Sequence, residues 1–148
     1  MQGFSLFSSQ HKPTTSERKK IVDFLFEELG KYGDSKAAIS KCVAFALQET
    51  PQAVGGFVLI CQDDDQRMVG AAIVNETGMT DYIPENILVY IAVDHHSRGK
   101  GIGGKLIAKI QEATQGDIAL HVDPENPARR LYQRMGFTAP YLEMRYRR

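Results

Sequence analysis

Apolar residues in the first third of the chain recur three to four positions apart in two stretches, which is the spacing of helices. The first stretch follows Thr14 and Glu17, which have the pattern of a capping box, and it ends at Gly30. The second follows Ser35, a residue type that caps helices, and runs toward residue 50. A short apolar stretch precedes both. The pattern therefore predicts a strand over residues 3–8 and then two helices.

After residue 55 the pattern changes to short apolar runs bounded by polar turns, which is typical of strands. Residues 56–62 and 67–75 flank three consecutive aspartates, so together they predict a hairpin. A polar loop over residues 76–86 follows. Residues 87–93 are almost entirely apolar, which predicts a central strand buried on both faces.

The next segment alternates between helix and strand patterns. Residues 101–114 place apolar side chains on one helical face and charged ones on the other, and Gly116 follows as a stop signal. Residues 118–122 predict a short strand. A strand, a helix and a second strand in this order indicate that the sheet continues with a helix covering one face.

The C-terminal part begins with Asn126 and Pro127, a strong signal for the start of a helix, which we expect to end at Gly136. Residues 141–147 predict a last strand. Because no repeat, linker or break in composition interrupts the chain, we expect a single domain over residues 1–148. Its expected class is mixed α/β (α+β), a sheet with helices on its faces.

Composition narrows the function without identifying it. Of the 148 residues, 43% are apolar and 24% are charged, which is typical of a globular protein. Lys and Arg together number 18, as do Asp and Glu, and this balance argues against a nucleic-acid-binding or membrane-surface protein. The start of the chain lacks the layout of a secretion signal, so we expect a cytoplasmic protein. Cys42 and Cys61 lie among apolar neighbours and are predicted to be buried, reduced thiols.

The most unusual stretch runs from Ser97 to Leu106 and holds four glycines, two lysines and one arginine. Such bare, basic backbone is typical of phosphate binding. It fits the nucleotide P-loop pattern from Gly99 to Lys105, but Leu106 stands where a hydroxyl must hold Mg²⁺. It also fits the dinucleotide pattern G-x-G-x-x-G, with Asp123 as the later acid, but five residues separate that glycine from the strand.

A third interpretation rests on two motifs in order. The first is Arg98-x-x-Gly101-x-Gly103 after a central strand, and the second runs from Asn126 through Leu131-Tyr132 to Gly136-Phe137. Together they resemble the acetyl-CoA loop and the N…LY…GF helix of the GNAT superfamily of N-acetyltransferases. The resemblance covers roughly residues 56–137.

The GNAT resemblance implies a fold, a reaction and a cofactor. The fold is a mostly antiparallel sheet of about six or seven strands with a splayed central pair, flanked by about four helices. The reaction is direct transfer of an acetyl group from acetyl-CoA to a primary amine of a small molecule, peptide or protein, within a ternary complex. The alternative is a non-catalytic regulatory module that binds acetyl-CoA.

The resemblance also assigns residues to roles. Tyr132 matches the general acid that protonates the departing thiolate, and a backbone N–H near Val93 matches the donor to the thioester carbonyl. His121 and Glu85 are the two candidates for the base, and a water chain without a base is the third possibility. The residues expected to bind the cofactor are Ile91, Ala92, Val93, Arg98, Gly99, Lys100, Gly101, Ile102, Gly103, Gly104, Lys105, Asn126 and Tyr132.

The acceptor and the assembly are less constrained by the sequence. The loop at residues 76–86 carries Glu76, Asp81, Tyr82 and Glu85, and these acids favour a cationic amine. His95 and His96 suggest a metal site, but no third ligand is evident in the sequence, so we expect a solvated hinge and no metal. We expect a monomer or a homodimer, in which a partner chain supplies strands that the short C-terminal tail lacks.

Overall fold

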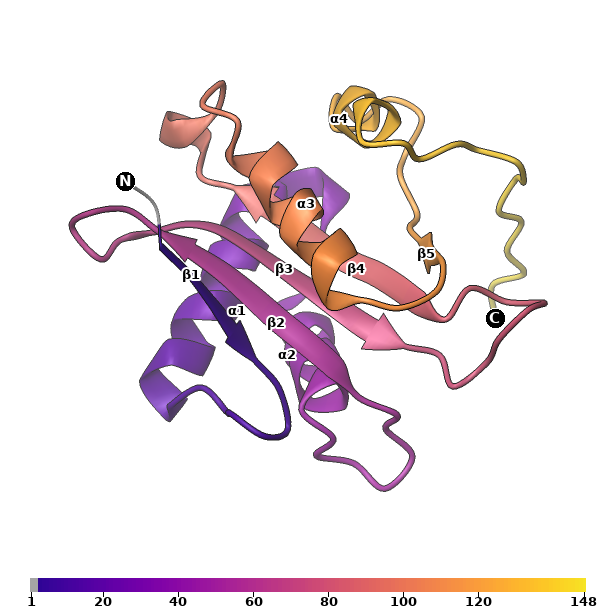
Figure 1. The fold of residues 1–148 in the computed structure, drawn as a ribbon, viewed down its shortest axis with the longest axis horizontal. Coiled ribbons are helices and arrows are strands. Elements are labelled where there is room, and N and C mark those ends of the chain that lie inside the picture. Colours follow the sequence, from indigo (N-terminus) through magenta and orange to yellow (C-terminus); the bar gives the residue numbers. More distant parts are fainter. Residues whose placement is uncertain (1–2) are drawn as a thin grey trace.

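The computed structural model describes residues 3–148, which form five strands and four α-helices in a mixed order (Figure 1). The strands are β1 (Gly3–Phe7), β2 (Gly56–Gln62), β3 (Met68–Glu76), β4 (Asn86–Val93) and β5 (Ile118–Ala119). The helices are α1 (Thr15–Leu29), α2 (Lys36–Ala46), α3 (Ile102–Ala113) and α4 (Arg129–Arg134), with 3₁₀ turns η1 (Gly30–Tyr32) and η2 (His95–Ser97).

The strands form one sheet in the order β1-β2-β3-β4-β5. All neighbours are antiparallel except β4 and β5, which are parallel. Helices α1 and α2 cover one face and α3 covers the other, so a separate apolar core lies on each side of the sheet (Figure 1). The expected mixed α/β class is confirmed, with five strands instead of six or seven. No helix among residues 3–148 is long and apolar enough to cross a membrane.

The predicted starts of α1 and α2 are confirmed by their capping hydrogen bonds. The Thr14 hydroxyl accepts from the backbone N–H of Glu17 at 3.1 Å, and the Glu17 carboxylate accepts from the backbone N–H of Thr14 at 2.8 Å. This reciprocal pair satisfies two backbone donors that a helix start leaves unpaired. The Ser35 hydroxyl likewise accepts from the backbone N–H of Ala38 at 3.1 Å and caps α2.

The C-terminal third differs from the sequence-based prediction. Residues 141–147 form no strand, and Tyr141, Leu142, Met144 and Tyr146 are each at least 84% exposed. Their alternating pattern suits a strand, but the tail pairs with no sheet edge, and a strand without a hydrogen-bonded neighbour is not stable in water. The strand expected over residues 118–122 is limited to Ile118–Ala119.

The fourth helix begins later than expected, at Arg129 instead of Pro127. The side-chain oxygen of Asn126 accepts from the backbone N–H of Ala128 at 2.9 Å, which makes a turn before the helix. Asn126 is therefore a turn residue two positions before the N-cap, Ala128, and not the N-cap itself.

The prediction that residues 87–93 form a central strand buried on both faces is wrong, because the middle strand of the sheet is β3 and β4 lies next to the last strand. Strand β4 pairs with β3 from Asn86 to Val93, with an irregularity near Val89, and it pairs with β5 only at Asn86 and Ile87. The side chain of Val89 is 37% exposed. The apolar composition predicted a strand here correctly, but the central position belongs to β3, and the divergence of β5 leaves residues 88–93 of β4 at an open edge.

Candidate functional site

The open edge of β4 is the first feature of the site. Residues 88–93 pair with β3 on one side and with no strand on the other, because the chain after Ala119 diverges from β4. The backbone N–H and C=O groups on this side are available to an extended ligand that adds itself like a strand. Ile91, Ala92 and Val93, which were expected to bind the cofactor, lie in this open part.

The divergence of the chain after Ala119 leaves a gap beside β4. Asn86, which is 3% exposed, lies at one end of this gap. Its side-chain nitrogen donates to the carbonyl oxygens of Gln115 at 2.7 Å and Asp117 at 3.2 Å, which fixes the chain just before β5. The Tyr32 hydroxyl in η1 donates to the carbonyl oxygen of Glu125 at 3.2 Å and fixes the chain between β5 and α4. The sheet therefore opens between two fixed points.

The glycine-rich loop lies at the other end of β4. Gly99 and Gly101 have φ angles of +80° and +78°, a left-handed backbone region that residues with a side chain rarely adopt. Gly101 is the N-cap of α3 and has no side chain to cap the amides that follow it. These amides point out of the positive end of the helix, which suits an anion such as a pyrophosphate. Arg98 and Lys100 are exposed beside them.

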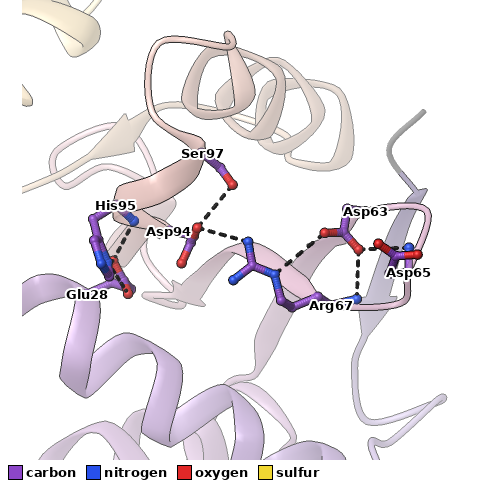
Figure 2. A network of polar contacts seen from close by, with 7 residues as sticks. All are labelled: Glu28, Asp63, Asp65, Arg67, Asp94, His95 and Ser97. Carbon is purple, nitrogen blue, oxygen red and sulfur yellow. Dashed lines mark hydrogen bonds and ion pairs between the residues drawn. The ribbon is translucent and has the colours of Figure 1, made fainter.

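A buried turn holds the start of this loop. The Asp94 carboxylate accepts from the Ser97 hydroxyl at 3.0 Å and contacts the Arg67 guanidinium at 3.3 Å (Figure 2). Burial by itself raises the pKa of the Asp94 carboxyl, but the Ser97 hydrogen bond and the nearby positive charges outweigh burial and lower that pKa overall. Asp94 therefore stays ionised and fixes the turn from which Arg98 leaves.

The other predicted loop residues have packing roles. Ile102 is 3% exposed and belongs to the core beside α3, so only its backbone faces a ligand. A Cβ on Gly103 would lie 2.7 Å from Cδ2 of Leu131, and a Cβ on Gly104 would lie 3.9 Å from Sδ of Met135. These glycines thus allow α4 to approach α3. Lys105 is exposed on α3.

Tyr132 lies on α4, which packs against α3. The Gln111 side chain donates to the carbonyl oxygen of Met135 at 3.0 Å and ties the end of α4 to α3. Tyr132 is 8% exposed, and its ring meets Phe137 edge-on with centroids 6.1 Å apart. Burial raises the pKa of the Tyr132 phenol above its ordinary value. The phenol is therefore protonated at neutral pH, as a proton donor must be.

The two candidate bases lie in different surroundings. The Glu85 carboxylate accepts from the backbone N–H of Asp117 at 3.1 Å and packs on Gly116, where a Cβ would lie 2.4 Å from its carboxyl carbon. His121 is exposed and follows β5 outside any regular element.

Glu85 also borders a hollow of about 420 Å³ at the start of β4. The residues that line the hollow come from the loop before β4, the start of β5 and the tail: Asp81, Tyr82, Ile83, Pro84, Glu85, Asp117 and Tyr141. Three of these described side chains are acidic and none is basic. The hollow thus presents negative charge and two aromatic rings, a combination that attracts cations.

Sequence reasoning missed three polar residues that hold β4 and its neighbours in place, namely Asn86, Tyr90 and Asp34. Asn86 was assigned to the loop before the strand, although an amide beside an apolar run was a usable signal. Tyr90 donates its hydroxyl proton to Asp34 at 2.6 Å, which ties β4 to the connection between α1 and α2. Burial, and then this carboxylate, raise the pKa of Tyr90 well above its ordinary range. Nothing in the sequence pairs residues 56 positions apart.

Comparison with known proteins agrees with this geometry. The model of the acetyltransferase (GNAT) domain family matches residues 54–139. The 5-NmdU N-acetyltransferase of Pseudomonas phage PaMx11 is 40% identical over 57 residues, which cover 37% of this chain and 41% of that protein. The match thus spans less than half of the length of this relative.

Two solved structures share the fold. Aminoglycoside N-acetyltransferase AAC(6')-Iy in complex with CoA superposes with a TM-score of 0.70 and 19% identity, covering 100% of this chain and 95% of that one. The ribosomal-protein-alanine N-acetyltransferase from Brucella melitensis biovar Abortus 2308 gives a TM-score of 0.64 and 17% identity, covering 99% of both chains.

Proposed function

This chain belongs to the acetyltransferase (GNAT) family, and on that premise we propose that it acetylates the amine of a small cationic molecule by direct transfer in a ternary complex. The enzyme class and the cofactor expected from the sequence, an acetyltransferase that uses acetyl-CoA, are confirmed by the family. The observation that carries the choice of acceptor is the acidic hollow at the start of β4, which has no basic lining residue among those described.

The ends of β4 define two sides for the two substrates. We assign the pyrophosphate of CoA to the amides of residues 99–104, with Arg98 and Lys100 adding positive charge. The extended pantetheine arm then runs along the open edge past Val93, Ala92 and Ile91. The acceptor amine approaches from the opposite end, where Glu85 borders the hollow. This arrangement leaves one substrate on each side of the thioester.

The proposed reaction joins the amine nitrogen to the thioester carbonyl carbon. A backbone N–H near Val93 stabilises the oxyanion of the tetrahedral intermediate. When the carbon–sulfur bond breaks, Tyr132 gives its phenol proton to the CoA thiolate. The proton that the amine loses goes to Glu85 or His121, or to water. Asn126 holds the turn before α4 and thereby orients Tyr132.

Residues 1–148 are proposed to act as one catalytic domain. Strand β1 and helices α1 and α2 precede the family match, yet they pack on the same sheet that carries the site. A cytoplasmic location is proposed because acetyl-CoA is an intracellular metabolite and both cysteines are buried and unpaired.

Ligand binding is the first test. Acetyl-CoA and CoA at about 100 times their Kd should stabilise the protein by about 2.7 kcal/mol, whereas ATP–Mg²⁺ and NAD should not. The readout is the midpoint of thermal unfolding. Stabilisation by ATP or NAD alone would mean that the glycine-rich loop binds another nucleotide.

The role of Tyr132 is tested by Tyr132→Phe, with Tyr146→Phe in the exposed tail as the matched control. We expect Tyr132→Phe to lower kcat by about 10²–10⁴-fold, the usual contribution of a general acid, while the affinity for acetyl-CoA stays within a few fold. Tyr146→Phe should change neither. If acetyl-CoA binds but no amine is acetylated by the unmodified protein, the non-catalytic binding module is the better description.

The choice of acceptor is tested with a panel of polyamines, aminoglycosides and neutral amines. The measured quantity is the rate at which the CoA thiol is released. Asp81→Asn and Asp117→Asn should raise KM for cationic acceptors without changing KM for acetyl-CoA. Asp65→Asn, in the turn between β2 and β3, is the control. Equal KM values for Asp81→Asn and Asp65→Asn would contradict a role of the hollow in binding.

The base is identified from pH profiles. The two variants to compare are Glu85→Gln and His121→Ala. The one that removes the base should no longer show the fall of kcat/KM at acidic pH, and its maximal kcat/KM should be lower. A fall at acidic pH that is retained in both variants points to the water chain.

A further inference from the structure

The histidine pair after β4 has no part in the proposed reaction, and the fold brings acidic partners to one of its members. Glu28 on the last turn of α1 and Asp94 at the end of β4 lie beside His95 (Figure 2). One ligand atom from each of the three side chains lies within 4.8 Å of the others. The sequence could not indicate this third group, because 66 residues separate Glu28 from Asp94.

Existing contacts orient two of the ligands. The Oε1 atom of Glu28 accepts from the backbone N–H of His95 at 2.8 Å, and Nδ1 of His95 lies 3.1 Å from both Glu28 carboxylate oxygens. The Oδ2 atom of Asp94 accepts from Ser97 and contacts Arg67, which leaves Oδ1 for another partner. The Asp94 carboxylate is thus held through Oδ2, whereas both Glu28 oxygens contact His95, so a bound ion would take the place of the contact between Oε2 and Nδ1.

The charges at this place are not balanced within the protein. The side chains of Glu28 and Asp94 are 10% and 8% exposed. Arg67 is shared between Asp94 at 3.3 Å and Asp63 at 3.6 Å, so this one cation faces two carboxylates, while Glu28 contacts His95. Glu28 also lies at the negative end of α1, whose last turn has no basic residue. Buried negative charge of this kind calls for a cation.

We propose that Glu28, Asp94 and His95 bind a divalent transition ion of the Zn²⁺ type, with water completing its coordination. Bonds of about 2.0–2.2 Å at angles between square and tetrahedral place two ligand atoms of one ion about 3.0–3.4 Å apart. The Nδ1 to Oε2 separation of 3.1 Å lies in this range, and the Asp94 oxygen, within 4.8 Å of the other two ligand atoms, moves closer when the ion binds. An imidazole nitrogen among the ligands favours Zn²⁺ over Mg²⁺ or Ca²⁺. His95 is 58% exposed, which gives the ion and its waters access.

The proposed ion joins α1 to the turn that precedes Arg98. It would hold residues 94–97 in place from the side of α1. Its role is structural: it positions the start of the glycine-rich loop, and it takes no part in the transfer step. The proposal therefore stands or falls independently of the acceptor and of the roles of Tyr132 and Glu85.

The test is a titration of the full, untagged chain, stripped with a chelator, with Zn²⁺ in a non-chelating buffer by calorimetry, and with Co²⁺ followed by its absorption spectrum. We expect one ion per chain and a rise of the unfolding midpoint with Zn²⁺. His95→Ala and Glu28→Gln should each weaken binding by at least about 10–100-fold, the range that loss of even an outer-shell partner produces. His96→Ala is the matched control and should bind as the unmodified protein does.

Three results would overturn the proposal. They are no saturable binding of Zn²⁺ or Co²⁺, equal weakening by His96→Ala and His95→Ala, and equally tight binding of Mg²⁺ or Ca²⁺. In the first case the contact between Glu28 and His95 holds the turn without a metal ion. Because Glu28→Gln keeps the size of a side chain that is 90% buried, it remains informative if another variant unfolds.

Discussion

The two sides of β4 differ in how the chain is held. On one side, β1, β2 and β3 pair along most of their length, and α1 and α2 cover them with side chains such as Ile21 and Leu25 that are fully buried. On the other side, β5 has two residues, α4 has six, and the tail after Phe137 is exposed. The first side has the packing of a stable core, and the second is attached at a few points.

This difference shows where binding becomes possible. If β5 paired with β4 along its whole length, the backbone groups of residues 88–93 would form hydrogen bonds within the protein itself. Because pairing stops at Ile87, the same backbone groups are left for a ligand. Regions with fewer contacts are also the ones that open and move most easily, which suits the segment that carries Tyr132.

The largest effect should come from the packed side. Ile73 in β3 is fully buried, so Ile73→Ala removes side-chain contacts on all sides and should lower the free energy of unfolding by about 2–5 kcal/mol. Leu142→Ala, at a side chain 90% exposed, should change it by no more than about 0.5 kcal/mol. Urea unfolding measures both. Similar losses in the two variants would mean that the tail is packed against something in solution.

The attachment of α4 should affect turnover more than stability. In Gly103→Ala the new Cβ displaces Leu131 and with it Tyr132, so we expect kcat to fall by up to about 100-fold. The gain in helix propensity of about 1 kcal/mol offsets the crowding, so the unfolding midpoint should change little. Gly104→Ala meets only an ordinary contact and is the control. An unchanged kcat in Gly103→Ala would mean that the position of α4 does not control the rate of catalysis.

The junction of β4 with β5 should have an intermediate effect. Asn86→Ala removes both side-chain hydrogen bonds to the chain before β5 and leaves two carbonyls without this donor. We expect a loss of about 1–3 kcal/mol and faster hydrogen exchange at Ile118 and Ala119. Asn75→Ala is the matched control, because its side-chain oxygen is buried without a partner and its loss should cost less.

The effect that is smallest at neutral pH is a pH dependence that originates on the packed side. Burial raises the pKa of the Cys42 thiol from 9.0 to about 12. The unfolded chain loses this proton first, so the contribution of Cys42 to stability is complete below pH 9 and is lost as the pH rises toward 12. The free energy of unfolding should therefore fall less steeply between pH 8 and 11 in Cys42→Ala than in the unmodified protein. Equal slopes would contradict a buried, neutral thiol.

Local signals predicted most of the fold on the packed side. The capping box at Thr14 and Glu17, the Ser35 cap and the apolar runs of β2, β3 and β4 all lie within a few residues of the elements they define. The same reasoning failed for residues 141–147, whose alternation satisfied a local rule while no sheet edge accepted them. The helix expected at Pro127 begins at Arg129 for a similar reason, since Asn126 closes a turn before it.

The sequence by itself determined the family, the order of the elements and the loop between Arg98 and Lys105, because glycines, caps and motif spacing act over short distances along the chain. Only the tertiary structure decided where β5 leaves β4, which acids surround the hollow at Glu85, and that Glu28 meets His95. Each of these depends on residues far apart in the chain whose approach is set by packing of the whole sheet. Local pattern identifies the groups that do chemistry, and packing decides which of them meet.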